Sequence, residues 1–113
     1  MNERDRDRLC HMLDASREAI SFVQGRTKED LFRDRLLLLA VVKEIEIVGE
    51  AASRISSEGR SEAPDIPWPK VIGMRNRLSH EYFDWDLEAI WSTLTSNLPV
   101  LIRELERALS GSE

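Results

Sequence analysis

Cysteine is nearly absent from this sequence of 113 residues, where Cys10 is the only one. A single thiol excludes an intramolecular disulfide and any metal site built on several thiolates, so we expect a reduced, cytoplasmic setting. Long apolar runs are missing too. The longest aliphatic stretch runs only from Leu36 to Val42, whereas a membrane-spanning helix needs about 20 such residues. The first residues, MNERDRDRL, are charged and lack the apolar centre of a signal peptide.

Helix breakers and excess positive charge are also scarce. The chain has 5 glycines and 4 prolines, so long, uninterrupted elements are expected. No stretch has the alternating pattern of a strand, and there is no internal repeat or glycine-rich phosphate loop. The formal net charge is −5, which argues against broad electrostatic binding to nucleic acid. It leaves room for a local basic site.

The pattern that is present is helical. Apolar residues at alternating three- and four-residue steps predict a first helix from about Arg4 to Val23. A second, long helix is expected from about Lys28 to Ser56, begun by the pair Thr27 and Asp30. Its apolar stripe is too wide for one partner, so we place this helix at the centre of the fold. Gly49 in its middle costs about 1 kcal/mol relative to Ala, which predicts close backbone packing there.

The second half of the chain is more broken. Residues 57–67 are predicted to form a polar loop, and a short third helix to run from Pro69 to about Leu78. Asp84 is expected to cap a fourth helix, with Pro99 kinking it and Gly111 ending it. The predicted fold is therefore all-α, a single domain over residues 1–113, built as an up-and-down bundle of four main helices with a kinked last helix.

The segment GMRNRLSHEYF, residues 73–83, concentrates the chemistry. It holds Arg75, His80 and Tyr82. On a continuous helix Arg75 and His80 would point about 140° apart, so they converge only if the helix ends between them or a second copy faces the first. Histidine exchanges protons near neutral pH, and arginine matches phosphate oxygens. Together they suit metal-free cleavage of RNA, in which the 2′-OH attacks and a 2′,3′-cyclic phosphate forms.

Such a cleavage needs two proton-transfer groups, and the segment supplies one histidine. A two-fold homodimer would bring two copies of His80 and of Arg75 into one cleft. From Trp68 to His80 the chain carries Lys70, Arg75 and Arg77 and no acid, so that cleft could be positive on an acidic protein.

Less specific interpretations exist for each of these features. A helical arginine is usually a solvated surface residue, and a histidine near a tyrosine is usually packed or capping. Nothing near His11 makes a site. The acids at 84, 86 and 88 resemble a metal cluster, yet a helix start explains them better. Met12, Met74 and the tryptophans are expected to lie in the core.

Set in longer context, the segment resembles a known family. IPWPKVIGMRNRLSHEYF, with VGEAASRIS before it and DLEAIWSTLTSNLPVL after it, is similar to the HepT-like branch of the HEPN superfamily over nearly the whole sequence. The resemblance implies a metal-independent endoribonuclease toxin of a toxin–antitoxin pair, without a cofactor. Its R-x4-H-x-Y motif implies that Arg75 and His80 are catalytic, with Asn76 and Arg77 in support.

The resemblance also implies a partner, a minimal nucleotidyltransferase that neutralises the toxin. One route is AMPylation of the motif tyrosine, here Tyr82. Two alternatives stay open. The chain could be a non-catalytic helical dimer that binds a nucleotide or the nucleotidyltransferase, with Arg75 as a phosphate contact, or a purely structural helical dimer.

Overall fold

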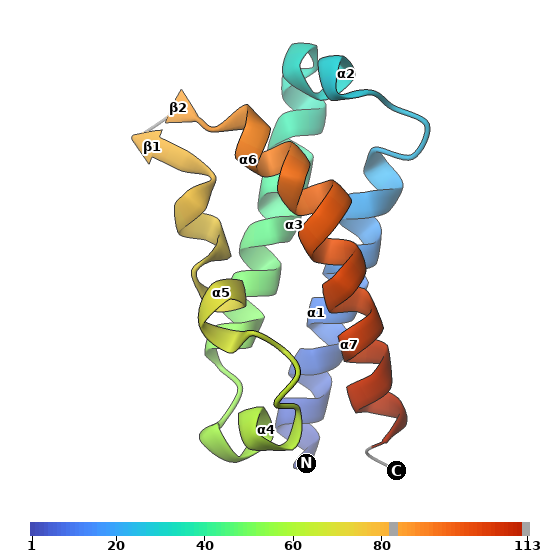
Figure 1. Ribbon diagram of the computed structural model, residues 1–113, viewed down its shortest axis with the longest axis vertical. Coiled ribbons are helices and arrows are strands. Elements are labelled where there is room, and N and C mark those ends of the chain that lie inside the picture. Colours follow the sequence, from blue (N-terminus) through green and yellow to red (C-terminus); the bar gives the residue numbers. More distant parts are fainter. Residues whose placement is uncertain (82–83, 112–113) are drawn as a thin grey trace.

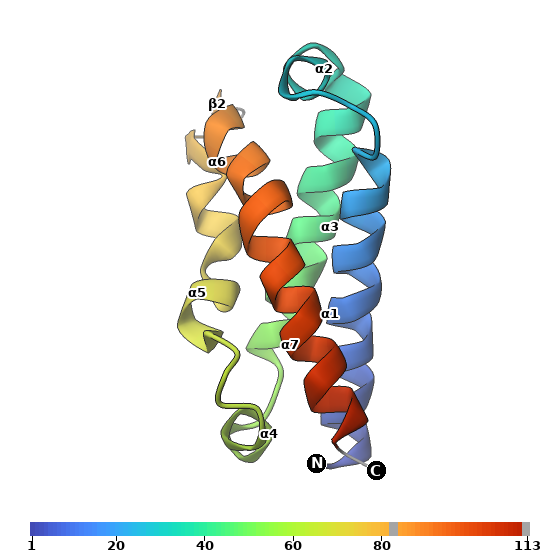
Figure 2. The ribbon, with the colours of Figure 1, turned by 45° about the vertical axis from the view of Figure 1, so that its right-hand side comes forward.

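Three long helical rods form the body of the molecule (Figure 1). The computed structural model describes residues 1–81 and 84–111, with residues 79–81 described by their backbone. The first rod is α1 (Glu3–Phe22), the second is α3 (Arg35–Ser53), and the third is the joined run of α6, η2 and α7. Turning the molecule by 45° shows that the third rod crosses the other two obliquely (Figure 2). The predicted all-α fold is confirmed.

The remaining helices and strands are short and lie outside the three rods. They are α2 (Lys28–Arg33), α4 (Ser57–Glu62), α5 (Trp68–Ile72), the 3-10 helix η1 (Met74–Arg77), and the strands β1 (Ser79–Glu81) and β2 (Asp84–Trp85). The third rod consists of α6 (Leu87–Ser92), the π-helical η2 (Thr93–Asn97) and α7 (Leu98–Ser110). No helix in the described ranges is long and apolar enough to cross a membrane.

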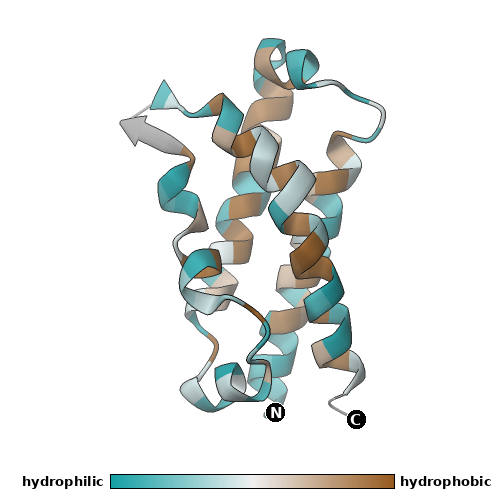
Figure 3. Cartoon of the chain, in the orientation of Figure 1, coloured by the Kyte–Doolittle hydropathy of each residue, from teal (hydrophilic) through white to brown (hydrophobic). Residues whose placement is uncertain are grey.

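The core lies between α1 and α3, which share the most extensive contact in the molecule. Hydrophobic residues recur along both helices (brown in Figure 3), and most of them are buried in this core. Leu9, Met12, Ile45 and Val48 have no solvent exposure. Leu105 of α7 closes the same core. The wide apolar stripe predicted for the central helix is thus buried on more than one side, against α1 and against α5.

The predicted helix from Lys28 to Ser56 is wrong in one respect, because the chain breaks at Asp34. The start signal is confirmed: Thr27 and Asp30 form a reciprocal capping box. Asp34 then adopts an extended conformation, and its carboxylate accepts a hydrogen bond from the amide of Leu37 at 3.1 Å. A side chain that caps a new helix competes with continuing the old one, and periodicity alone does not reveal this.

The polar loop predicted at 57–67 contains a helix, α4. Ser56 caps it by accepting a hydrogen bond from the amide of Gly59 at 3.0 Å. The carboxylate of Asp5, at the start of α1, accepts hydrogen bonds from both the amide and the hydroxyl of Ser56. This tie to a residue more than fifty positions away stabilises a turn of helix whose own sequence is polar and short.

The predicted third helix divides into α5 and η1 around Gly73. The α5 backbone lies beside Gly49 of α3, where an added Cβ would be 3.5 Å from the carbonyl oxygen of Ile72 and 3.6 Å from that of Val71. These are ordinary van der Waals distances that leave room for an alanine methyl, so close packing does not account for the glycine as predicted. The packing of η1 on α3 holds Arg75 against the side of α3.

The last helix is irregular where Pro99 predicted an interruption. Pro99 has no N–H for the carbonyl of Thr95, and the preceding residues 93–97 widen into a π-helical stretch. Two threonine hydroxyls of this stretch bond back to carbonyls four residues earlier, Thr93 to Ala89 and Thr95 to Trp91, a pattern that bends helices. The prediction that Asp84 caps this helix is wrong. The cap is Asp86, whose carboxylate accepts a hydrogen bond from the amide of Ala89.

Candidate functional site

The chain leaves its helical path between Arg75 and His80. The 3-10 helix η1 ends at Arg77, and the amide of Leu78 closes the turn on the carbonyl of Arg75 at 3.1 Å. The strand β1 follows and pairs antiparallel with β2 (Figure 1). A helix end between the two motif residues, one of the two arrangements that the sequence left open for their convergence, is therefore present.

The small hairpin itself contradicts the prediction of no strands. Ser79 pairs with Trp85 and Glu81 with Asp84, with an irregularity between the two pairs on the β1 side. The amide of Asp86 donates a 2.6 Å hydrogen bond to the carbonyl of Leu78 and closes the base of the hairpin. Strands of three and two residues are too short to show alternation, which explains why the sequence did not reveal them.

Of the two remaining motif residues, only His80 lies in the described part of the chain. The backbone of His80 lies in β1, at the irregularity in the pairing. Tyr82 lies outside the described residues.

Arg75 is exposed on η1. Its side chain is 68% exposed, and its Nε lies 3.9 Å from Oε2 of Glu46 on α3. A long, solvated ion pair of this kind contributes at most about 1 kcal/mol. The guanidinium is therefore held near α3 but remains able to take an anionic ligand.

The side chains of Asn76 and Arg77 have different surroundings. Asn76 lines the same groove as Arg75. Arg77 instead donates a 2.9 Å hydrogen bond to the carbonyl of Lys70 near the end of α5, and it is not among the residues that line the groove. Arg77 thus ties η1 to α5.

Arg75 opens onto a groove of about 490 Å³ between α1, α3 and η1. Its cationic lining residues are Arg8, Lys43, Arg54 and Arg75, and its acidic ones are Glu46 and Glu50. We call this feature the basic groove. Four cations against two acids make it positive on a chain of net charge −5. Of Lys70, Arg75 and Arg77, which were predicted to make a cleft positive, only Arg75 lines this groove.

The cations of the basic groove differ in their partners. Arg54 pairs with Glu50 at 2.8 Å, with both side chains largely exposed, and Arg8 donates a 2.6 Å hydrogen bond to the carbonyl of Arg54. Lys43 has no hydrogen bond or ion pair within the described part of the chain.

The sequence analysis did not select Arg8, Lys43 or Arg54, because they lie far from the motif along the chain. A weak signal exists, since residues 43, 47, 50 and 54 share one face of a helix.

Other polar clusters do not form a metal site. Across the described residues, no group of three or more His, Cys, Asp or Glu side chains could hold a metal ion. Asp86 caps α6, and Glu88 lies in the first turn of that helix, where it pairs with Lys28 at 2.9 Å. The start of a helix therefore explains Asp86 and Glu88, as predicted. Asp84 instead lies in β2.

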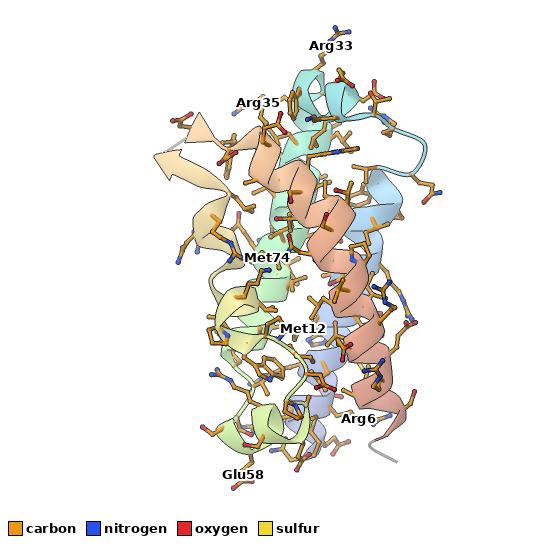
Figure 4. The ribbon with its side chains drawn as sticks, viewed as in Figure 1. Arg6, Met12, Arg33, Arg35, Glu58 and Met74 are labelled. Carbon is orange, nitrogen blue, oxygen red and sulfur yellow. The ribbon has the colours of Figure 1, made fainter. Side chains whose placement is uncertain are left out.

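Of the two methionines and three tryptophans predicted to lie in the core, three are buried. Met12 and Met74 are buried among the helices (Figure 4), and so is Trp68. Trp85 and Trp91 are half-buried and pack against the core.

One further acid stands out. Glu44 of α3 is buried, and it lines a hollow of about 230 Å³ together with His11, Asp14 and Glu18 of α1. Burial, a hydrogen bond with Glu18 and repulsion from its charge together raise the pKa of Glu44 to about 7. His11 itself is exposed at the rim.

Comparison with known proteins decides the family. A family model described as "Ribonuclease HepT-like" matches residues 12–108. The chain belongs to the HepT-like ribonuclease family. The resemblance predicted from the motif and its flanking sequence is confirmed.

Individual HepT-like relatives match over most of their length. A protein of Caldanaerobacter subterraneus subsp. tengcongensis named "Putative RNase" is 35% identical over 101 residues, which cover 89% of this chain and 90% of that protein. "Probable ribonuclease HepT" of Thermococcus cleftensis is 34% identical over 94 residues, covering 80% and 86%.

The name of one longer relative combines two activities. "Gamma-glutamylcyclotransferase and putative RNase" of Methanocaldococcus jannaschii is 32% identical over 97 residues, 86% of this chain and 44% of that protein. No solved structure matches this chain significantly.

Proposed function

We propose that this HepT-like protein is a metal-independent endoribonuclease and the toxin of a toxin–antitoxin pair. The observation that carries the proposal is the exposed Arg75 guanidinium, placed where the helix ends before His80 and facing the basic groove. Family membership adds support, because two relatives bear names that specify RNase activity. RNA is the proposed substrate, since it carries its own nucleophile in the 2′-OH.

In the proposed mechanism, His80 accepts the proton of the 2′-OH as that oxygen attacks the adjacent phosphorus. Arg75 stabilises the charge on the five-coordinate phosphorus through paired hydrogen bonds. A second imidazole, from His80 of a partner copy, donates its proton to the leaving 5′-oxygen. The P–O5′ bond breaks, and the products are a 2′,3′-cyclic phosphate and a free 5′-hydroxyl. Asn76 lines the groove beside Arg75, and its proposed role is to orient the phosphate.

Exposed apolar side chains support a homodimer. Leu36 is 81% exposed and Leu39 41% exposed near the start of α3, and Phe32 of α2 is 36% exposed. This end of α3 lies at the same end of the molecule as the hairpin (Figure 1). Adjacent exposed apolar residues are typical of interaction sites. A second copy that covers them would come close to the hairpin and its His80.

The proposed partner is a nucleotidyltransferase that attaches AMP to the hydroxyl of Tyr82. The added phosphate would carry negative charge into a segment that follows His80 by two residues. Like charges repel an RNA backbone and the adenosine adds bulk, so cleavage would stop.

The test of the nuclease is expression of the protein alone, followed by incubation of the purified protein with RNA in EDTA. We expect the wild type to slow growth and to leave 2′,3′-cyclic ends. Arg75→Ala and His80→Ala should each lower the cleavage rate about 10²–10⁴-fold. Arg103→Ala, which removes an exposed arginine from α7, is the matched control. A wild type that neither slows growth nor cleaves RNA would sink the proposal.

The test of the switch is mass measurement after incubation with ATP and the neighbouring nucleotidyltransferase. One or more AMP units should be added to the wild type and none to Tyr82→Phe. No gain in mass, or a gain that persists in Tyr82→Phe, contradicts the assignment.

A second function is compatible with the same groove. Its cations could bind the phosphates of a nucleotide, or dock the nucleotidyltransferase, without any cleavage. The distinguishing result would be a wild type that binds AMP or ATP through Arg75 and leaves RNA intact.

A further inference from the structure

The basic groove continues well beyond the motif. Lys43, Ile47, Glu50 and Arg54 follow one another on α3 at steps of four, three and four residues, so they share one face. At a rise of 1.5 Å per residue, Lys43 and Arg54 are about 16 Å apart along the helix axis. Arg75 and Asn76 border this face from η1, and Arg8 borders it from α1. The groove is thus a track with cations at both ends, and the catalytic motif supplies only part of it.

The charges along the track are available for a ligand. Lys43 has no partner within the described residues. The contact of Arg75 with Glu46 spans 3.9 Å. Arg54 and Glu50 form a surface pair with side chains 62% and 63% exposed, and such pairs contribute little. An anion that displaces these weak contacts loses little and gains two or more cationic partners.

The lining also indicates what kind of anion fits. Among the described lining residues the apolar members are aliphatic, chiefly Ile47 and Ile72, and none is aromatic. Many proteins that bind single strands without sequence preference add stacking of the bases on aromatic rings, and this groove offers none, so its contacts would be with the phosphates. A linear series of cations without stacking surfaces suits a phosphate backbone and does not read sequence.

We propose that the basic groove binds the phosphate backbone of single-stranded nucleic acid next to the cleavage site, with Lys43 as its main unpaired contact and Arg54 and Arg8 at its far end. This inference rests on the proposed ribonuclease function, because it assigns the path of that substrate. It separates two roles on the chain: α3 and α1 supply sequence-independent affinity, and the η1–β1 segment supplies the chemistry.

The test uses a single-stranded DNA oligonucleotide, which has the same phosphates as RNA and no 2′-OH to be cleaved. Its affinity for the full protein is measured over a range of salt concentrations. Lys43→Gln should weaken binding about fivefold, and the slope of log affinity against log salt should fall by about 0.7, the value for one phosphate contact on a single strand. Glu50→Gln, which frees Arg54, should strengthen binding.

Controls separate local from general charge effects. Arg103→Gln removes one exposed positive charge from α7, away from the groove lining, and should leave affinity and slope unchanged. Free AMP, up to millimolar concentrations, should fail to displace the oligonucleotide, because it offers one phosphate to a track built for several. If AMP competes fully, the groove is a mononucleotide site and the proposal is overturned.

The proposal is also overturned if Lys43→Gln and Arg103→Gln behave alike, or if the oligonucleotide does not bind. These outcomes are distinct from failure of the nuclease. A protein that binds DNA through Lys43 but never cleaves RNA supports the groove and contradicts the catalytic function. A protein that cleaves RNA with Lys43→Gln as well as with the wild type supports catalysis and contradicts the groove.

Discussion

Glu44 shows how one buried side chain couples the fold to pH. It lies on α3 where α3 packs against α1, and the acids around it are Glu18 and Asp14, with His11 at the rim. One of its oxygens is buried without a hydrogen-bond partner. Burial comes first among the causes that raise its pKa to about 7, followed by the interactions with Glu18. The folded protein therefore keeps a proton that the unfolded chain releases near 4.5.

The sign of the effect on stability follows. A folded-state pKa above the unfolded value means that the contribution is fully present below about pH 4.5 and is lost as pH rises through about 7. We expect the melting temperature of the wild type to fall between about pH 5 and about pH 8, and Glu44→Gln to flatten that decline because its amide stays neutral. Thermal unfolding followed by circular dichroism measures both profiles. Parallel profiles for the two proteins would contradict the assignment.

Asp5 gives the stability of the fold a pH dependence opposite to that of Glu44. Burial alone would raise the pKa of Asp5, but its hydrogen bonds with Ser56 and the charge of Arg8 outweigh burial and lower the pKa. Its contribution is therefore present above the ordinary value of 3.8 and is lost as pH falls. Asp5 and Glu44 set opposite limits to the pH range in which the fold is most stable.

At the scale of single elements, two glycines in helices predict opposite results. An alanine Cβ at Gly59 in α4 would lie 2.5 Å from Oδ2 of Asp5 and 3.0 Å from Cγ2 of Ile55. Asp5 is held by two hydrogen bonds from Ser56 and cannot move aside freely. At Gly49 in α3 the nearest atoms are 3.5 and 3.6 Å away, which is ordinary contact.

We therefore expect Gly59→Ala to lower the free energy of unfolding by about 1–3 kcal/mol, because overpacking outweighs helix propensity. Gly49→Ala should raise it by up to about 1 kcal/mol through propensity alone. Urea titrations of the two variants against the wild type give both values. The packing argument is wrong if Gly59→Ala is the more stable of the two.

The elements also show what the sequence could predict. The capping box at Thr27 was predictable, because it rests on residues within one turn. The break at Asp34 and the helix α4 were not, because an alternative cap decides the first and the distant Asp5 supports the second. The helix end after Arg75 was predictable from the chemistry of the motif. The hairpin that follows was not, because its strands are too short to carry a pattern.

In the basic groove, too, residues within a local motif could be predicted and residues brought together by packing could not. Arg75 and Asn76 were selected because they sit in a recognisable motif. Lys43, Arg54 and Arg8 come from two other helices, and only the packing of η1 on α3 brings them into the same groove. Contacts between residues so far apart along the chain leave no local pattern in a single sequence.

At the scale of the whole molecule, the apolar end of α3 predicts the oligomeric state. Leu36 and Leu39 are exposed near the start of α3, which lies at the same end of the molecule as the hairpin (Figure 1), and we expect a second copy to cover them. The double change Leu36→Glu, Leu39→Glu should convert the proposed dimer to a monomer and abolish the proposed cleavage, because in that mechanism each site needs the partner's His80. Sedimentation and the RNA assay measure the two effects.

Val100→Glu is the matched control, since Val100 is 48% exposed on α7, outside this apolar surface. It should remain dimeric and active. The shared-cleft mechanism fails if the double variant is monomeric and still cleaves RNA at the wild-type rate. It also fails if the wild type is a monomer at working concentration.

The start of α1 and the end of α7 lie at one end of the molecule, and the hairpin lies at the other (Figure 1). A reporter protein or an affinity tag joined to either end would therefore hang from the side remote from β1 and β2. Tagged versions should keep the segment after η1 accessible to RNA and to a modifying partner. The Methanocaldococcus jannaschii relative, whose name joins an RNase to a gamma-glutamylcyclotransferase in one chain, is compatible with such attachment. In practice, fluorescent fusions at either end are suitable tools for following this protein in living cells.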